Sequence, residues 1–169
     1  MRIHKVRMAF CVIGLAAIAY AASLSNADKE FLVMAAKANM TEAHEGQMAE
    51  DQGASAEVKD FGKTLVQDHT DAYGQLSILA NKAGVTIPKG INTGKDRTIQ
   101  QLVHLKGSGF DRQFARYEVT AHRQAIAAFK REAEHGEDPD VKAYASKMVP
   151  ILEKHLMLAE QCAKPPKKS

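Results

Sequence analysis

Apolar residues recur every three or four positions along four long stretches of the chain, which is the period of an α-helix that buries one face. The stretches run from about residue 28 to 51, 55 to 83, 108 to 135 and 138 to 163. A shorter amphipathic stretch, TIQQLVHLKG, lies between the second and the third. We find no alternating strand pattern of useful length and no internal repeat. The chain is therefore predicted to be all-α.

Local signals mark the ends of these helices. Ser55 is predicted to cap the second helix, and Asp138 to cap the fourth, with Pro139 in its first turn. Ser108, followed three residues later by Asp111, resembles a capping box at the start of the third. Glycines end the first three helices (Gly53, Gly84, Gly136). The tight connections near 51–54 and 136–138, with a long segment at 84–107, predict a four-helix bundle of two antiparallel hairpins joined by a long crossover that contains the short helix.

The N-terminus has the layout of a secretory signal peptide. Three basic residues in MRIHKVR precede the uncharged run MAFCVIGLAAIAYAA, which is shorter than the roughly 20 residues of a membrane span. We expect residues 1–27 to be a cleaved signal peptide, with cleavage after Ala21 as the alternative. Residues 28–163 then form one bundle domain, and 164–169 a disordered basic tail. This predicts a periplasmic protein without a membrane span in its mature form, with association with the outer membrane left open.

Charge and cysteine content exclude several functions. The leader holds three of the 23 Lys and Arg residues and no acidic residue, so 20 basic residues remain against 20 acidic ones. A mature chain with no net charge lacks the basic footprint of a nucleic-acid-binding protein. The mature chain has one cysteine, Cys162, so no internal disulfide is possible. A small apolar role on the last helix is favoured for it, with a disulfide-linked homodimer as the alternative.

Each long helix carries at least one metal-ligating side chain on its apolar face. At about 100° per residue, Glu42 falls near the centre of the first face, His69 near that of the second, Glu118 and His122 on the third, and His155 on the fourth. Counting from the hairpin loops at about 1.5 Å per residue places the three histidines within little more than one turn of each other. Glu42 is expected one to two turns away.

Neutral imidazoles with one or two carboxylates suit zinc, copper or iron, so this group predicts a site for one transition metal ion. The same side chains could instead form a hydrogen-bond network without a cofactor. A di-iron carboxylate site is not expected, because the only Glu-x-x-His motif, Glu132 to His135, lies at a helix end. The chain also lacks a CxxCH haem motif, a phosphate-binding loop and a GxSxG elbow.

Several segments together resemble a known family. They are the run AKANMTEAHEGQMAEDQGASAEVKDFGKTLVQDHTDAYGQL, the helix start at Gly109-Phe110-Asp111 with Tyr117 and His122 after it, and Met148-Val149-Pro150 leading to His155-Leu156. Across about residues 28–163 the chain resembles the exported bacterial family called domain of unknown function 4142, whose members are often labelled outer membrane proteins. The resemblance implies a ferritin-like helical bundle in the bacterial envelope. It also implies that Glu42, His69, His122 and His155 occupy polar positions typical of the family.

Two functions remain open from the sequence. The first is a periplasmic bundle that binds a transition metal through the Glu and His cluster, in metal handling or envelope stress. The second is a cofactor-free envelope module that binds an unidentified protein, with the crossover 84–107 as the partner surface. An enzyme is not expected, although a metal held by three histidines with an open position could activate water.

Overall fold

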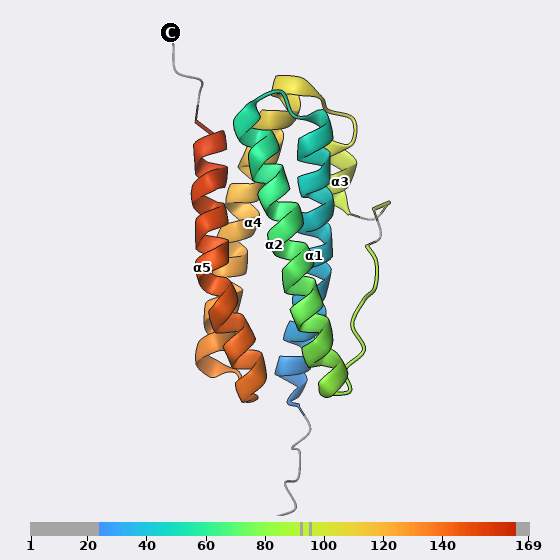
Figure 1. The fold of residues 1–169 in the computed structure, drawn as a ribbon, viewed down its shortest axis with the longest axis vertical. Coiled ribbons are helices and arrows are strands. Elements are labelled where there is room, and N and C mark those ends of the chain that lie inside the picture. The colour runs from blue at the N-terminus through green and yellow to red at the C-terminus, as the bar shows by residue number, and fades with distance from the viewer. Residues whose placement is uncertain (1–23, 92, 95, 165–169) are drawn as a thin grey trace, which may run out of the picture.

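The computed structural model describes residues 24–91, 93–94 and 96–164, and four long helices run side by side along its length (Figure 1). These helices are α1 (Asn26–Gln52), α2 (Ala56–Lys82), α4 (Gly107–His135) and α5 (Pro139–Cys162), and the short helix is α3 (Arg97–Leu102). The described residues contain no strand. The all-α bundle predicted from the sequence is confirmed.

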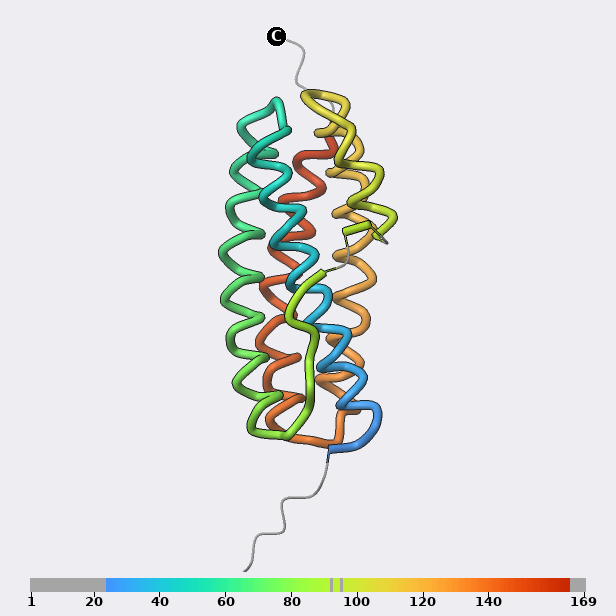
Figure 2. The backbone as a smooth tube through the Cα atoms, turned by 90° about the vertical axis from the view of Figure 1, so that its right-hand side faces the viewer, coloured from blue at the N-terminus to red at the C-terminus, as the bar shows by residue number. Residues whose placement is uncertain are grey.

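The helices pair as two hairpins, α1 with α2 and α4 with α5, and the hairpins meet along α2 with α5 and α1 with α4. Figure 2 shows the crossover running along the length of the bundle from the end of α2 to α3, close to the start of α4. The Tyr73 hydroxyl on α2 donates a hydrogen bond to the carbonyl oxygen of Pro88 at 2.8 Å, which ties this segment to the bundle. The predicted crossover with its short helix is confirmed.

The cap at the start of α2 forms as expected, since the Ser55 hydroxyl accepts a hydrogen bond from the Val58 N–H at 3.3 Å. The Asp138 carboxylate accepts from the N–H groups of Asp140 and Val141 at the start of α5. Both predictions are confirmed.

The capping box predicted at Ser108 is wrong. Helix α4 begins at Gly107, which has a φ of 61°, and no side chain caps it. The Asp111 carboxylate instead accepts hydrogen bonds from the N–H groups of Ala54 and Ser55, at 2.9 and 3.0 Å. A carboxylate that sequence reasoning assigned to its own helix end thus holds the loop of the other hairpin.

Asp28 makes the matching contact at the opposite end of the bundle. Its carboxylate is buried and accepts from the backbone N–H groups of residues 137 and 138, at 3.1 and 3.2 Å. Burial raises the pKa of Asp28, but hydrogen bonds with the Ser25 side chain, with these two N–H groups and with the Glu132 side chain outweigh it and hold the pKa below its usual value. Each hairpin therefore clamps the loop of the other through one aspartate.

The contacts of Asp28 and Asp111 show that the two hairpins are structurally equivalent, which the sequence alone did not reveal. One constant offset along the chain relates each position in the first hairpin to its counterpart in the second (Asp28 to Asp111, Phe31 to Phe114, Gly53 to Gly136, Ser55 to Asp138, Val58 to Val141). Few residues are identical at this offset, so no repeat is visible by inspection. The hairpins are nevertheless equivalent in how they end and how they hold each other.

The apolar core consists of two clusters, one toward each end of the bundle. One contains the edge-to-face pair Phe31 and Phe129, with ring centroids 4.9 Å apart. The other contains Phe110 stacked on Phe114 at 5.4 Å. Buried polar side chains of α1, α2, α4 and α5 occupy the level between the clusters (Asn39, Glu45, His69, Glu118, His122, His155). We call this level the polar layer.

The residues at the start of α1 help to compare the two cleavage sites predicted for the signal peptide. The predicted signal peptide lies largely in residues 1–23, outside the described residues, and most of the predicted tail, residues 165–169, also lies outside them. Leu24 is buried in the core, and the Ser25 hydroxyl accepts from the N–H of Asp28 as the N-cap of α1. Cleavage after Ala21 would retain this cap, whereas cleavage after Ala27 would remove it. Among the described helices, none has an apolar stretch long enough to cross a membrane.

Helices α1 and α2 pass close to each other at two glycines, Gly46 and Gly62. A Cβ atom at Gly62 would lie 2.6 Å from the carbonyl oxygen of Gly46, and a Cβ at Gly46 would lie 2.6 Å from that of Gly62. These contacts are with rigid helix backbone, so a side chain at either position would force the helices apart. The crossing lies close to Glu45 in sequence and therefore next to the polar layer.

We predict that Gly62→Ala lowers the free energy of unfolding by about 1–3 kcal/mol, the usual cost of overpacking a tight contact. Gly74→Ala on the same helix is the matched control, because a Cβ there would meet nothing within 4 Å. Its higher helix propensity should stabilise the protein by up to about 1 kcal/mol. Urea unfolding followed by circular dichroism measures both variants. Equal effects of the two substitutions would contradict the close crossing.

Candidate metal site

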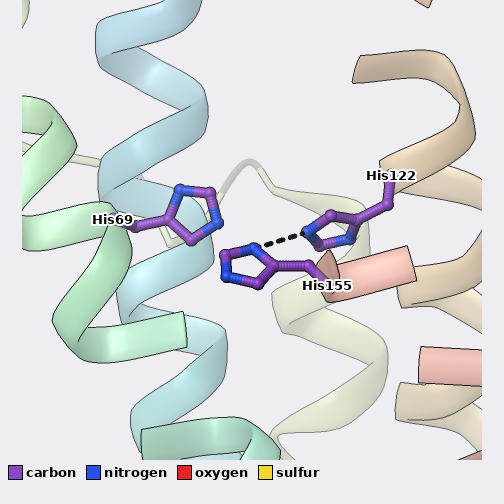
Figure 3. Close-up of side chains that lie close together, drawn as sticks. All are labelled: His69, His122 and His155. Atoms are coloured by element: carbon purple, nitrogen blue, oxygen red, sulfur yellow. Dashed lines mark hydrogen bonds between the residues drawn. The ribbon is translucent and has the colours of Figure 1, made fainter. Parts of the chain in front are cut away.

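Three histidines from three helices meet in the polar layer. His69 on α2, His122 on α4 and His155 on α5 point their rings toward one another (Figure 3). The ring centroids lie 5.1 Å apart for His69 and His155, 5.3 Å for His122 and His155, and 6.1 Å for His69 and His122. One ring nitrogen from each lies within 4.8 Å of the other two, and each side chain is at most 3% exposed. We call these residues the histidine triad.

One nitrogen of each ring is engaged by an acceptor outside the triad. His69 Nδ1 lies 2.9 Å from Asn39 Oδ1, and His155 Nε2 lies 2.9 Å from Asp68 Oδ2. His122 Nδ1 lies 3.0 Å from the carbonyl oxygen of Glu118, one turn earlier on α4. Since a carboxylate and a carbonyl only accept, His122 and His155 donate from these nitrogens. The amide of Asn39 is oriented by the Tyr144 hydroxyl, to which its Nδ2 donates at 3.0 Å.

These outer contacts determine the tautomers and leave three lone pairs facing inward, on His69 Nε2, His122 Nε2 and His155 Nδ1. His122 Nε2 and His155 Nδ1 are 3.3 Å apart, which is hydrogen-bond distance when one of the two nitrogens carries a proton (Figure 3), and His69 Nε2 has no hydrogen-bond partner among the described residues. Converging lone pairs repel one another unless a cation or a proton lies between them. The geometry therefore matches a metal-ligand set whose outer nitrogens are oriented by second-shell acceptors.

Burial favours the neutral form of two rings of the triad. It holds the pKa of His69 well below the usual value, with a further lowering by the charges of His155 and His122. It also lowers the pKa of His155 to about 4, although the hydrogen bond to Asp68 acts in the opposite direction. Both rings are neutral near pH 7, and neutral imidazole is the form that binds metal ions.

Carboxyl groups lie on the other side of His122. Glu118 Oε2 is 3.2 Å from His122 Nδ1, and one ligand atom from each of Glu42, Glu118 and His122 lies within 4.8 Å of the other two. Burial raises the pKa of Glu118 to about 8, and burial and the neighbouring Glu118 raise that of Glu42 well above its usual range. His122 thus faces the triad with one nitrogen and the carboxyl groups with the other.

The structure brings together all five side chains selected from the sequence, in two adjoining groups that share His122. Glu42 belongs to the group with Glu118 and His122 and not to the histidine triad. This agrees with the expectation that it lies further along the bundle axis than the histidines. Helical periodicity and depth were sufficient to find these residues. Whether any of them binds a metal stays a prediction.

Three further residues belong to the site, and the sequence analysis did not select them. Glu45 is fully buried beside Glu42, and its place on the same apolar face of α1 was the signal that could have found it. Asp68 and Asn39 act through partners on other helices, His155 on α5 and His69 on α2. The residue pattern within a single helix does not predict such contacts, because they depend on how the helices are aligned with one another.

Comparison with known families identifies the chain's relatives. Residues 14–162 match the model of a family described as Domain of unknown function (DUF4142). The chain belongs to this family. The resemblance drawn from the sequence is therefore confirmed, while a comparison with curated proteins gave no match.

Solved structures of similar fold include CopM and a mycobacterial protein. CopM in the Cu(II)-bound form has a TM-score of 0.68 at 15% identity, with 80% of this chain and 95% of that chain covered. CopM in the Cu(I)-bound form has a TM-score of 0.67 at 15% identity, with 79% and 93% covered. The conserved hypothetical protein Rv2844 from Mycobacterium tuberculosis has a TM-score of 0.63 at 16% identity, with 80% and 96% covered. At these identities the likeness concerns the fold alone.

The buried groups predict a stability maximum in mildly acidic solution for the metal-free DUF4142 protein. The contribution of His155 is present above its ordinary pKa of 6.5 and is lost as the pH falls toward about 4. That of Glu118 is present below its ordinary pKa of 4.5 and is lost as the pH rises toward about 8. Urea unfolding of chelator-treated protein at a series of pH values measures this. A stability that rises steadily from pH 6 to 8 would contradict the assignment.

Proposed function

We propose that this protein is an exported bundle that binds one transition metal ion, with copper favoured, through His69, His122 and His155. The observation that carries the proposal is the inward convergence of three imidazole lone pairs while the second nitrogen of each ring is held from outside. Without an ion these lone pairs would face one another in a dry core. A metal would convert that repulsion into three coordination bonds.

The donor set favours copper among the metals that the sequence allows. Imidazole nitrogen suits copper, zinc, iron and nickel, and among divalent ions the affinity of such a site is highest for Cu²⁺. CopM, which shares the fold, has been solved in Cu(I)-, Cu(II)- and Ag-bound forms. A protein of this fold therefore binds copper and silver ions, which supports copper here.

Burial supports holding the ion rather than using it in catalysis. The three imidazoles are almost completely buried, so a bound ion would have little room for a substrate. This agrees with a role in metal handling within the envelope. Export to the periplasm is part of the proposal, and the basic and apolar N-terminal segment supports it.

We predict that tag-free protein purified without chelator takes up about one equivalent of copper at the triad. His155→Ala should weaken binding by more than about 100-fold, because changes outside the ligand shell alone cost 10- to 100-fold. Elemental mass spectrometry and competition with a chromophoric copper chelator measure stoichiometry and affinity.

His135→Ala is the matched control, since His135 is an exposed histidine at the end of α4. It should bind copper as the wild type does. Absence of bound copper, zinc and iron in the wild type after incubation with each would overturn the proposal. The triad would then be a structural network, as in a cofactor-free interaction module.

Asp68 gives a second test, because it orients His155 without belonging to the triad. Asp68→Asn keeps the shape of the side chain but replaces the charged acceptor of His155 Nε2 by a weaker one. We predict a loss of copper affinity of about 10- to 100-fold. Asp71→Asn, exposed on the same helix, is the control and should leave the affinity unchanged. Equal affinities in the two variants would show that the Asp68 contact does not act on the metal.

A further inference from the structure

A second group of unsatisfied side chains lies beside the triad, on the opposite side of His122. It consists of Glu42 and Glu45, one turn apart on α1, and Glu118 on α4. Glu45 and Glu118 are both 0% exposed. We call these three residues the carboxylate group.

The carboxylate group lacks the donors that buried carboxylates normally have. Both carboxyl oxygens of Glu45 are buried without a hydrogen-bond partner among the described residues. Those of Glu118 and Oε2 of Glu42 are also buried, and they have no donor from another residue apart from the contact that the two carboxyl groups make with each other. His122 Nδ1 approaches Glu118 at 3.2 Å, but that nitrogen is directed to the Glu118 carbonyl oxygen. A buried carboxyl group without hydrogen-bond donors is costly, so the carboxylate group needs a compensating cation or proton.

The three carboxyl groups also act on one another. Glu42 and Glu118 are in contact, and the charges of both reach Glu45. Like charges at this range cannot coexist in a buried site without a cation or shared protons. No lysine or arginine of the described residues supplies that charge, because every salt bridge of a lysine or arginine lies at the surface.

We propose that the carboxylate group forms a second cation site, distinct from the histidine triad, that takes a divalent ion preferring oxygen ligands. Glu42 and Glu118 are its ligands, because one carboxyl oxygen of each lies within 4.8 Å of the other, and the buried Glu45 adds negative charge beside them. Carboxylate oxygens suit Mn²⁺, Mg²⁺ and Ca²⁺, whereas imidazole nitrogens suit copper and zinc. The polar layer thus holds two sites of different chemistry, with His122 between them. The second site does not depend on metal binding at the triad.

Mn²⁺ is the probe, because its aqueous electron paramagnetic resonance signal disappears on binding. The full mature protein, stripped with chelator, is titrated with Mn²⁺ with and without one prior equivalent of Ag⁺, which prefers nitrogen to carboxylate oxygen. We expect about one equivalent of Mn²⁺ to bind in both cases. Binding of Ag⁺ is measured separately by elemental analysis, so that failure at the triad and failure at the carboxylate group are told apart.

Glu42→Gln tests the site directly while keeping the size of the side chain. It should weaken Mn²⁺ binding by about tenfold or more and leave copper stoichiometry at the triad unchanged. Glu30→Gln, exposed on the same helix, is the matched control and should bind Mn²⁺ as the wild type does. Circular dichroism checks that both variants are folded.

Three results would overturn the second site. These are no Mn²⁺ binding by the wild type, loss of bound Mn²⁺ on loading Ag⁺, or equal Mn²⁺ affinity in Glu42→Gln and Glu30→Gln. The first would mean that the carboxyl groups hold protons, and the second that Mn²⁺ occupies the triad. Should Glu42→Gln fail to fold, Glu118→Gln is compared with Glu30→Gln in its place.

Discussion

The need to satisfy ionisable side chains in the middle of a four-helix bundle constrains the rest of this structure. Burying an unpaired charge is costly, and the polar layer contains three histidines and two glutamates, with Glu42 beside them. The apolar clusters at the two ends supply the burial that offsets this cost. The bundle thus has an apolar core toward each end and a polar layer between them. Its free energy of unfolding depends on whether protons or metal ions occupy that layer.

The alignment of the helices along the bundle axis decides whether the triad forms at all. His69 comes from one hairpin, and His122 and His155 from the other, so a shift of one helical turn, about 5.4 Å, would separate them. Asp28 and Asp111 oppose such a shift from opposite ends, since each bonds two backbone N–H groups of the other hairpin's loop. The close crossing at Gly46 and Gly62 limits the spacing of α1 and α2 in the same region. Contacts far from the histidines therefore position them.

The sequence was sufficient to predict the features that depend on a single helix. Periodicity located four helices and the inward faces that carry Glu42, His69 and His122, and Ser55 and Asp138 marked two helix starts correctly. It failed where a side chain acts across helices. Asp111 was predicted to cap its own helix, but it bonds the loop between α1 and α2. The residue spacing within one helix does not determine how the two hairpins are aligned along the bundle. Asp68 escaped notice for the same reason, since its partner His155 lies on another hairpin.

The equivalence of the two hairpins ends at the polar layer, and this asymmetry separates the two chemistries. At the offset that pairs Asp28 with Asp111, His122 corresponds to Asn39 and His155 to Ala72. A symmetric bundle would present the same ligands from both halves, as two matched Glu-x-x-His motifs do. Here the second hairpin supplies two of three imidazoles, and the first supplies two of three glutamates. Nitrogen donors consequently gather on one side of His122 and oxygen donors on the other, which is the arrangement expected if the layer distinguishes between two kinds of ion.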